Sequence, residues 1–237
     1  MYTSLSKTQQ TVFVLLLPLA LLLGSCSTST GTHTQIDWVD FIQFHGITYL
    51  AGMGQQIGRS LEQQDLGPVF AQVQFKLNDN VTDPSYHMKD GDAAFLEAGT
   101  KVYTVKGYLP AFRLAAFSSQ GLQLFEADTN PHARTGADLL DLKDKVQFIT
   151  INSEKDGTTV LATVKDAQQV EQLVEMLLSS PVNQQQNAQD GLRYFLAFHL
   201  MDQTVVVRVY WPHANELARG ILPPPAFQAI IKQAMHI

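Results

Sequence analysis

The spacing of apolar and polar residues predicts a β-rich first half. Apolar residues recur at every second position in short runs that glycine or proline interrupts, a pattern typical of half-buried strands. The clearest run is Val69–Leu77, in which every odd position is apolar. Further strands are expected at Trp38–Ala51, with a bulge or hairpin bend at Gly46, and at Lys101–Tyr108, Ala111–Ala116 and Leu122–Glu126. We expect a small antiparallel β barrel or sandwich over residues 36–128.

The second half, residues 138–237, has an α+β pattern. The polar segment Ala127–Ala137 contains proline and glycine and marks the expected boundary. Asp166 is a good N-cap for a helix that Pro181 ends, with apolar positions at helical spacing. The other expected elements are strands Val146–Asn152 and Thr159–Val164, a hairpin Leu192–Trp211, and a terminal helix from Pro225 with Phe227, Ile230, Ile231 and Ala234 inward. The fold class is therefore α+β, ending in an antiparallel sheet with two helices (ββαββα).

The hairpin Leu192–Trp211 also provides the candidate binding surface. A two-residue turn at Asp202-Gln203 would pair Leu200 with Val205 and make one face apolar. The opposite face would then carry five candidate binding residues, namely Arg193, Phe195, His199, Arg208 and Tyr210. Arginines beside aromatic rings suit an acidic or aromatic partner. The alternative is an ordinary outer face, or one packed on the first domain, with arginine stems lying over rings.

The first 25 residues have the pattern of a signal peptide. Lys7 precedes an uncharged run, Val12–Leu23, whose 12 residues would span roughly 18 Å as a helix. That is well short of the ~30 Å hydrocarbon core of a bilayer, so an exported leader is favoured over a membrane span. Small residues then lead to the single cysteine, in the order Leu23-Gly24-Ser25-Cys26.

This tetrapeptide resembles the lipobox of bacterial lipoproteins. The resemblance implies cleavage before Cys26, a diacylglyceryl group on its sulfur, and further acylation, palmitate for example, of the new amino terminus. Two or three acyl chains on one residue give stable anchoring at the extracytoplasmic face of the cell membrane. The alternatives are an ordinary secretory signal with an incidental cysteine and an uncleaved anchor helix. Residues 26–35 are rich in Ser and Thr, and we expect them to be a flexible tether.

Composition and charge restrict the partners. Hydrophobic residues make up 45% of the 237 residues and charged ones 16%, enough apolar material for a packed core. The net charge is −6, and no cluster of Lys and Arg is present to attract phosphate backbones or anionic lipids. We therefore expect no nucleic-acid partner, and a membrane partner only through lipid on Cys26.

The sequence contains no recognisable catalytic, cofactor or metal motif. G-x-S-x-G and H-E-x-x-H are absent, and the seven histidines show no i, i+4 pair. Gly52, Gly54 and Gly58 lack the Lys-Ser/Thr of a phosphate loop, so we interpret them as a loop that needs backbone freedom. The acidic stretch Asp79–Glu97 suits either a solvated surface or, as the alternative, a bound calcium ion.

Three functional hypotheses follow for the folded body. The first is a non-enzymatic binding or interaction module at the cell envelope, whose partner is an unknown envelope protein or ligand. The second is a small envelope hydrolase with carboxylate catalysis, and the third is a structural component of an envelope complex. The second half resembles small exported lipoprotein domains of unknown function, a likeness that brings no catalytic, cofactor or metal residue with it.

Overall fold

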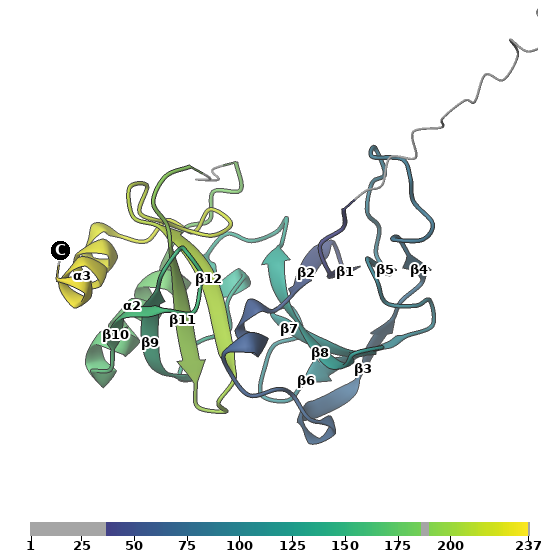
Figure 1. Ribbon diagram of the computed structural model, residues 1–237, viewed down its shortest axis with the longest axis horizontal. Helices are drawn as coiled ribbons and strands as arrows, with labels where there is room; N and C mark the ends of the chain where they lie inside the picture. The colour runs from purple at the N-terminus through teal and green to yellow at the C-terminus, as the bar shows by residue number, and fades with distance from the viewer. Residues whose placement is uncertain (1–36, 186–189, 237) are drawn as a thin grey trace, which may run out of the picture. The chain divides into compact units, whose positions relative to one another are not determined.

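The structure, a computed structural model, describes residues 37–185 and 190–236. The predicted signal peptide (1–25), Cys26 and the predicted tether (26–35) lie outside the described residues. Residues 36–237 form one compact unit. Its fold is mixed α/β, with two sheets and two α-helices among the described residues (Figure 1).

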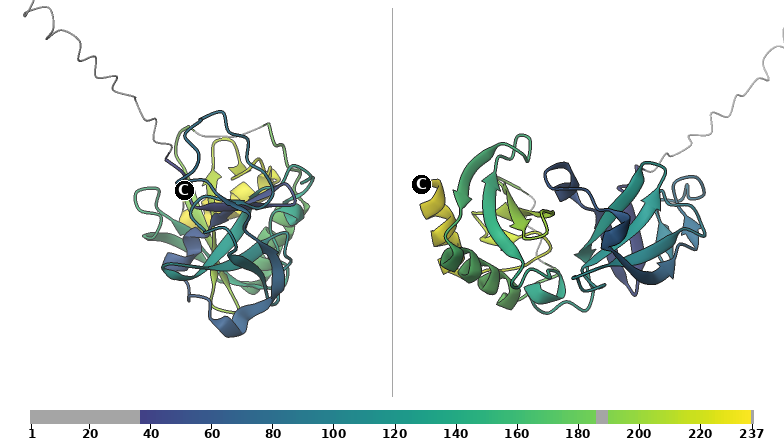
Figure 2. Two further views of the ribbon diagram at one scale, coloured as in Figure 1. Left: turned by 90° about the vertical axis from the view of Figure 1, so that its right-hand side faces the viewer. Right: turned by 90° about the horizontal axis from the view of Figure 1, so that it is seen from below.

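The first sheet has eight strands in the spatial order β3-β6-β7-β8-β2-β1-β5-β4, and it curls without closing (Figure 2). All pairings are antiparallel except β4 with β5. The strands are β1 (Phe41–Phe44), β2 (Ile47–Ala51), β3 (Leu66–Gln72), β4 (Phe75–Lys76), β5 (Asp92–Ala93), β6 (Lys101–Val105), β7 (Arg113–Ser118) and β8 (Gly121–Thr129). The prediction of a β-rich, mainly antiparallel first half is confirmed. In place of the predicted closed barrel or sandwich, the described residues form one curled sheet with β3 and β4 at its edges.

The bend predicted at Gly46 is a tight hairpin between β1 and β2. Phe44 pairs with Ile47, so the turn consists of His45 and Gly46 alone. Both turn residues have positive φ, 53° and 72°, as a hairpin whose twist matches its strands requires.

The strand predicted over Val69–Leu77 is wrong as a single element. β3 ends at Gln72 and β4 begins at Phe75, and the two strands lie at opposite edges of the sheet. β3 pairs with β6 through register shifts on both sides of Val69. Because such bulges reverse the alternation of side chains, Val69 is exposed although the period-two pattern placed it inside.

The second sheet has five antiparallel strands in the order β10-β9-β11-β12-β13. The elements are β9 (Val146–Asn152), β10 (Val160–Val164), α2 (Ala167–Ser179), β11 (Tyr194–Leu200), β12 (Val205–Trp211), β13 (Glu216–Leu217) and α3 (Pro225–Met235). An antiparallel sheet with two helices is as predicted. The short strand β13 was not predicted, so the order of elements differs from ββαββα.

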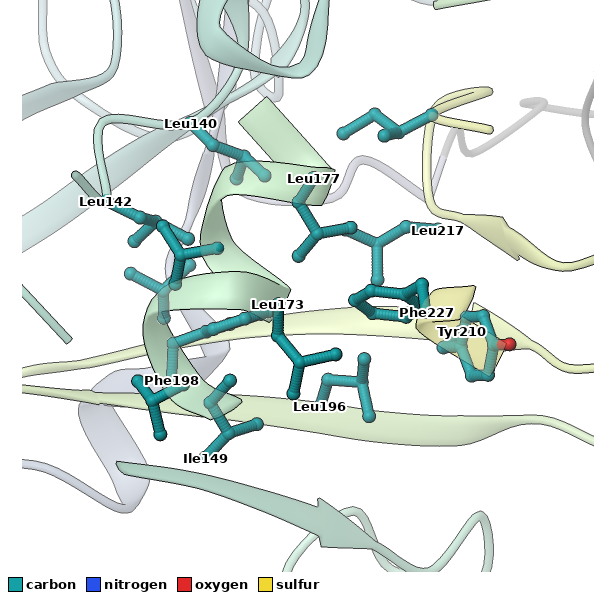
Figure 3. Close-up of a cluster of buried hydrophobic side chains, with 14 of the residues drawn as sticks. Leu140, Leu142, Ile149, Leu173, Leu177, Leu196, Phe198, Tyr210, Leu217 and Phe227 are labelled. Carbon is teal, nitrogen blue, oxygen red and sulfur yellow. The ribbon is translucent and has the colours of Figure 1, made fainter. Parts of the chain in front are cut away.

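Both helices pack on one face of this sheet and close its core (Figure 3). The Asp166 side chain accepts a hydrogen bond from the Gln169 backbone N–H at 2.9 Å, which confirms the predicted N-cap of α2. Pro225 occupies the first turn of α3, where its missing N–H costs no hydrogen bond. The helices contribute Val170, Leu173, Val174, Leu177, Phe227 and Ile231 to the core.

The predicted register of the β11–β12 hairpin is wrong by one residue. Phe198 pairs with Val206 rather than Val207, and His199 pairs with Val205. The cause is a three-residue loop, closed by the backbone N–H of Leu200 donating to the Thr204 carbonyl at 2.9 Å. Its last residue, Gln203, has φ 68°, the left-handed position typical of such loops. The shift exchanges the two faces of β12 while leaving those of β11 unchanged.

Residues from the first sheet reach into the second core. Phe112, next to β7, belongs to the cluster that β9, β11 and the two helices build. The loop that contains Gly52, Gly54 and Gly58 also approaches β12 closely. A Cβ on Gly54 would lie only 1.7 Å from the carbonyl oxygen of Val205. The proposed division into domains 36–128 and 138–237 stays a prediction, since the two sheets occupy these ranges but share these contacts.

Among the described residues, no helix has both the length and the apolar character needed to cross a membrane.

Candidate functional site

A cleft between the two sheets is the candidate site, and we call it the inter-sheet cleft. It has a volume of about 340 Å³, within the usual size of a small-molecule site. β2 and β8 form one wall, and β12 with the turn after β13 forms the other. Its lining residues are Leu50, Ala51, Gly52, Glu126, Ala127, Asp128, Val207, Arg208, Val209, Trp211, Ala218 and Arg219.

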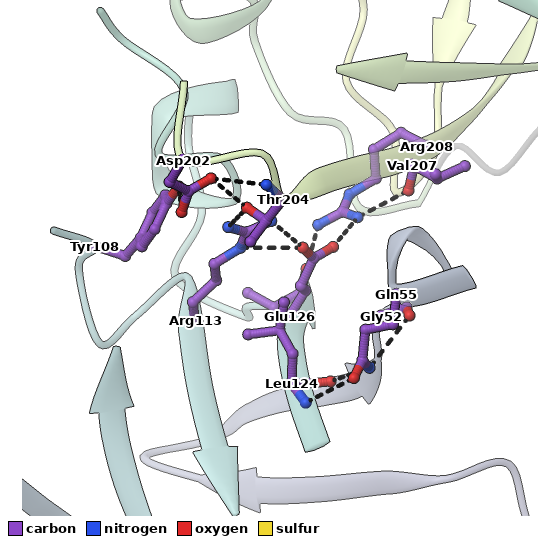
Figure 4. A network of polar contacts seen from close by, with 11 residues as sticks. Gly52, Gln55, Tyr108, Arg113, Leu124, Glu126, Asp202, Thr204, Val207 and Arg208 are labelled. Atoms are coloured by element: carbon purple, nitrogen blue, oxygen red, sulfur yellow. Dashed lines mark hydrogen bonds and ion pairs between the residues drawn. The ribbon is translucent and has the colours of Figure 1, made fainter. Parts of the chain in front are cut away.

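A buried ion network (Figure 4) includes two residues that line the inter-sheet cleft, Glu126 and Arg208. Glu126 on β8 is 3% exposed and Arg113 on β7 is 0% exposed. Arg113 donates from Nη2 to Glu126 Oε1 at 2.7 Å, and Arg208 on β12 donates from Nη1 to Glu126 Oε2 at 2.8 Å. Each oxygen of the carboxylate therefore has its own guanidinium, and the arginines come from different sheets.

The two arginines determine the charge state of Glu126. Burial alone would raise the pKa of this carboxyl, but the charges and hydrogen bonds of Arg113 and Arg208 outweigh that effect. The pKa of Glu126 consequently lies below its ordinary value, and the group is an anion at neutral pH. It is suited to holding positive charge in place and unsuited to donating a proton.

A chain of hydrogen bonds extends the network towards the β11–β12 loop. Arg113 donates to the Thr204 hydroxyl at 2.9 Å, and that hydroxyl donates to Asp202 at 2.7 Å. The Tyr108 hydroxyl donates to the other Asp202 oxygen at 2.8 Å, and its ring lies 4.5 Å from the Arg113 guanidinium carbon. Burial raises the pKa of Tyr108 to about 12, so its hydroxyl remains a donor. The network thus fixes Arg113 on several sides.

Arg219 occupies the rim of the inter-sheet cleft. Its side chain is 42% exposed and pairs with Asp128, Nη2 to Oδ2, at 2.5 Å. The backbone of Arg219 is left-handed, with φ 71°, in the tight turn between Leu217 and Ile221. A residue with a Cβ is disfavoured there by roughly 1–2 kcal/mol.

Trp211 adds an apolar wall with a polar edge. The residue is buried, and its indole nitrogen has no hydrogen-bond partner among the residues that the structure describes. Buried indole N–H groups usually have an acceptor. The inter-sheet cleft therefore combines guanidinium groups, carboxylates and an aromatic ring within one small volume.

The structure does not bring the five predicted binding residues together. Arg193 precedes β11 and is exposed, while Phe195 and His199 lie on the face of β11 opposite the helices. Ile57 from the first half of the chain packs against Phe195, Ala197 and Val207 on that face, as the alternative of a face packed on the first domain had it. Tyr210 is fully buried in the core, where its ring packs edge-on against Phe227. Arg208 alone of the five lines the inter-sheet cleft. The one-residue register shift explains this dispersal, since it turns Arg208 and Tyr210 away from Phe195 and His199.

His199 packs against residues of β9 on the same face of the second sheet. Its ring stacks on Phe148 with centroids 4.1 Å apart, and its Nε2 lies 3.2 Å from the Thr150 hydroxyl. Burial lowers the pKa of His199, which favours the neutral ring.

The sequence prediction missed Arg113 and Glu126, although a signal was present. Arg113 stands inside the run Ala111–Ala116, and Glu126 ends the run Leu122–Glu126 on the same face as Leu122 and Leu124; both runs were assigned to strands. A charge inside such a run indicates a buried ion pair as well as a strand. No local pattern in the sequence marks Arg219 as a cleft residue. Its place in the cleft depends on the pair with Asp128, which lies far from it in the sequence.

Several carboxylates of the acidic stretch Asp79–Glu97 are bound by other side chains of the protein. Lys76 pairs with Asp79 at 2.5 Å and with Glu97 at 2.7 Å. Asp92 accepts from the Tyr86 hydroxyl at 2.9 Å, and Asp83 accepts from Ser85. Within residues 37–185 and 190–236, no group of three His, Cys, Asp or Glu side chains is placed to hold a metal ion.

No family model matches the chain, and comparison with curated proteins and with solved structures finds no match to it either.

Proposed function

We propose that this chain is a membrane-anchored extracytoplasmic lipoprotein whose folded body is a non-enzymatic binding module. The inter-sheet cleft is its ligand site, and the ligand is a small molecule or peptide end that carries an acidic group. Attachment to the membrane is through lipid on Cys26.

The anchor part of the proposal is supported by the sequence. A 12-residue uncharged run after Lys7 is too short for a stable span, and it ends at the lipobox-like Leu23-Gly24-Ser25-Cys26. The Ser/Thr-rich residues that follow suit a tether between lipid and body. An anchor at this position would leave the inter-sheet cleft, which is built from residues 50–219, free to meet ligands outside the cell.

The observation that carries the binding part is the position of Arg219. Its half-exposed guanidinium lines the inter-sheet cleft, in an exchangeable pair with Asp128. Only the Arg219 side of this pair is exposed, and partly exposed pairs contribute little to stability, about 0–1 kcal/mol, so a ligand carboxylate can compete with Asp128 for the guanidinium. Arg208 is held behind it by Glu126 and provides a second, fixed positive group.

The same geometry favours binding over carboxylate hydrolysis. Acid catalysis by a carboxyl group requires a raised pKa, so that the group carries a proton at neutral pH. The pKa of Glu126 is instead lowered, and each of its oxygens is held by an arginine. Asp128 is likewise paired with a guanidinium.

Calorimetric titration of the full chain with citrate, glutarate and glycerol phosphate tests the binding site. We expect at least one probe to bind, and Arg219→Ala to weaken it tenfold or more, because a hydrogen bond to a charged group contributes about 1.5–3 kcal/mol. Arg193→Ala is the matched control, since Arg193 is an exposed arginine that does not line the inter-sheet cleft.

Two outcomes would count against the inter-sheet cleft as the site. One is the absence of binding by every probe up to about 10 mM, a concentration at which even weak small-molecule sites are occupied. The other is equal binding by wild type and the Arg219→Ala variant. If Arg193→Ala abolishes binding instead, the result favours the face of the hairpin Leu192–Trp211 that the sequence analysis had indicated.

A further inference from the structure

A second hollow lies on the first sheet, and we call it the Asp40 hollow. It has a volume of about 530 Å³, larger than the inter-sheet cleft and sufficient for a small ligand. The residues that matter for its chemistry are Asp40, Phe95, Glu97, Phe117, Gln120 and Gln123. None of them lines the inter-sheet cleft, so the two sites are independent.

Two phenylalanine rings border the Asp40 hollow and face solvent. Phe95 is 40% exposed and Phe117 is 46% exposed. Phe117 lies on β7 and is held edge-on to Tyr103, with ring centroids 6.3 Å apart. Exposure of an apolar ring to water is unfavourable. Two exposed rings at one hollow therefore mark a surface that the apolar C–H groups of a ligand can cover.

The charges at the Asp40 hollow argue against a charged ligand. Lys76 lines it and already pairs with Glu97 at 2.7 Å and with Asp79 at 2.5 Å. An anionic ligand would meet two carboxylates, Asp40 and Glu97, with a single ammonium beside them, whereas the inter-sheet cleft has two arginines for its two carboxylates. A cationic ligand would meet the Lys76 ammonium, which already holds Glu97. A neutral ligand avoids both repulsions.

The remaining polar groups are suited to hydroxyls. Gln123 donates from Nε2 to Asp40 Oδ2 at 2.5 Å. The other oxygen, Oδ1, is buried and has no hydrogen-bond partner among the described residues. Burial keeps Oδ1 out of reach of a ligand, whereas Oδ2 can accept a second hydrogen bond beside the one from Gln123, so Asp40 has unused acceptor capacity. Gln120, Thr100 and two serines add amide and hydroxyl groups that both donate and accept.

From this combination of exposed rings, paired charges and a carboxylate with unused acceptor capacity, we infer that the Asp40 hollow binds a neutral saccharide. The apolar C–H face of a pyranose ring stacks on Phe117 and Phe95. A sugar hydroxyl donates to Asp40 Oδ2, and the amides of Gln120 and Gln123 complete the hydrogen bonding.

The binding step has a defined pH dependence. Burial raises the pKa of Asp40 in spite of the Gln123 hydrogen bond, because desolvation disfavours the charged form. A sugar hydroxyl that donates to the carboxylate stabilises the charged form. Affinity is therefore full above the pKa of Asp40 in the free protein and falls as the pH drops through that value.

The test is calorimetric titration of the full chain, in a detergent without sugar groups, with tetramers of N-acetylglucosamine, β-linked glucose and α-linked glucose. We expect one of these saccharides to bind, with Phe117→Ala and Asp40→Asn each weakening binding about tenfold. Phe117 is exposed, so the melting temperature of its variant should match that of wild type. Leu109→Ala, which removes an exposed apolar side chain elsewhere, is the control and should leave binding unchanged.

The inference fails if no tetramer binds at about 10 mM, or if Phe117→Ala binds as tightly as wild type. It also fails if a tetraalkylammonium ion binds at Phe117 while the saccharides do not. Arg219→Ala should leave saccharide binding intact, which separates this site from the inter-sheet cleft.

Discussion

At the scale of single residues, Arg113 and Glu126 impose the strictest requirement on the fold. A fully buried guanidinium is costly to desolvate, and it is tolerated here because Glu126, Thr204 and the ring of Tyr108 surround it. Arg208 completes the pairing from the second sheet. Loss of the carboxylate would leave two arginines without their shared anion.

We predict that Glu126→Gln lowers the free energy of unfolding by about 3–5 kcal/mol, the usual cost of removing one partner of a buried ion pair. Urea unfolding measures this loss. Asp128→Asn is the control, because Asp128 pairs with a half-exposed arginine and its loss should cost under about 1 kcal/mol. Equal losses in the two variants would contradict the assignment of Glu126 as the structural centre.

His199 gives a prediction for the pH dependence of stability. Its pKa is lowered in the folded protein by burial, so the unfolded chain binds a proton more readily. The neutral ring makes its full contribution to folding stability above the ordinary histidine pKa of 6.5, and this contribution is lost as the pH falls below that pKa. We expect wild type to lose stability between pH 7 and pH 5 more steeply than His199→Gln. If the curves of unfolding free energy against pH run parallel for wild type and His199→Gln, the protonation of His199 is not linked to folding.

At the scale of elements, the sequence predicted helices well and strand register poorly. The N-cap at Asp166 and the apolar spacing of α2 are local signals, and the structure has both. Register depends on loop length, and the sequence Met201-Asp202-Gln203 does not reveal whether two or three residues turn. Bulges in β3 similarly escape a period-two pattern. The candidate binding face was therefore misassigned although its strands were found.

Close packing between elements predicts that substitution by alanine destabilises the protein strongly at Gly54 and only slightly at Gly52. A Cβ on Gly54 would overlap the Val205 carbonyl, whose backbone belongs to β12, so neither side can yield cheaply. We expect Gly54→Ala to lower the free energy of unfolding by about 1–3 kcal/mol or more. Gly52→Ala, with its nearest contact at 3.4 Å and φ −68°, should change it by under about 0.5 kcal/mol. Thermal or urea unfolding of both variants distinguishes this contact from a general need for flexibility.

At the scale of the whole molecule, composition and patterning predicted a packed body with a β-rich first half and a second half made of an antiparallel sheet and two helices. They did not predict that Phe112 and the Gly54 segment join the sheets, since these contacts connect residues far apart in sequence. The inter-sheet cleft arises at that junction, and the sequence prediction identified only Arg208 among its lining residues. The proposed role outside the cell depends on a separate feature, the lipidation of Cys26.

Intact-mass spectrometry of the protein extracted from its native membranes tests this proposed anchor most directly. We predict a chain that begins at Cys26 and carries a diacylglyceryl group on the cysteine sulfur, with or without a further acyl group on its amino terminus. A chain that retains residues 1–25, or one whose Cys26 thiol is free, would contradict the proposal.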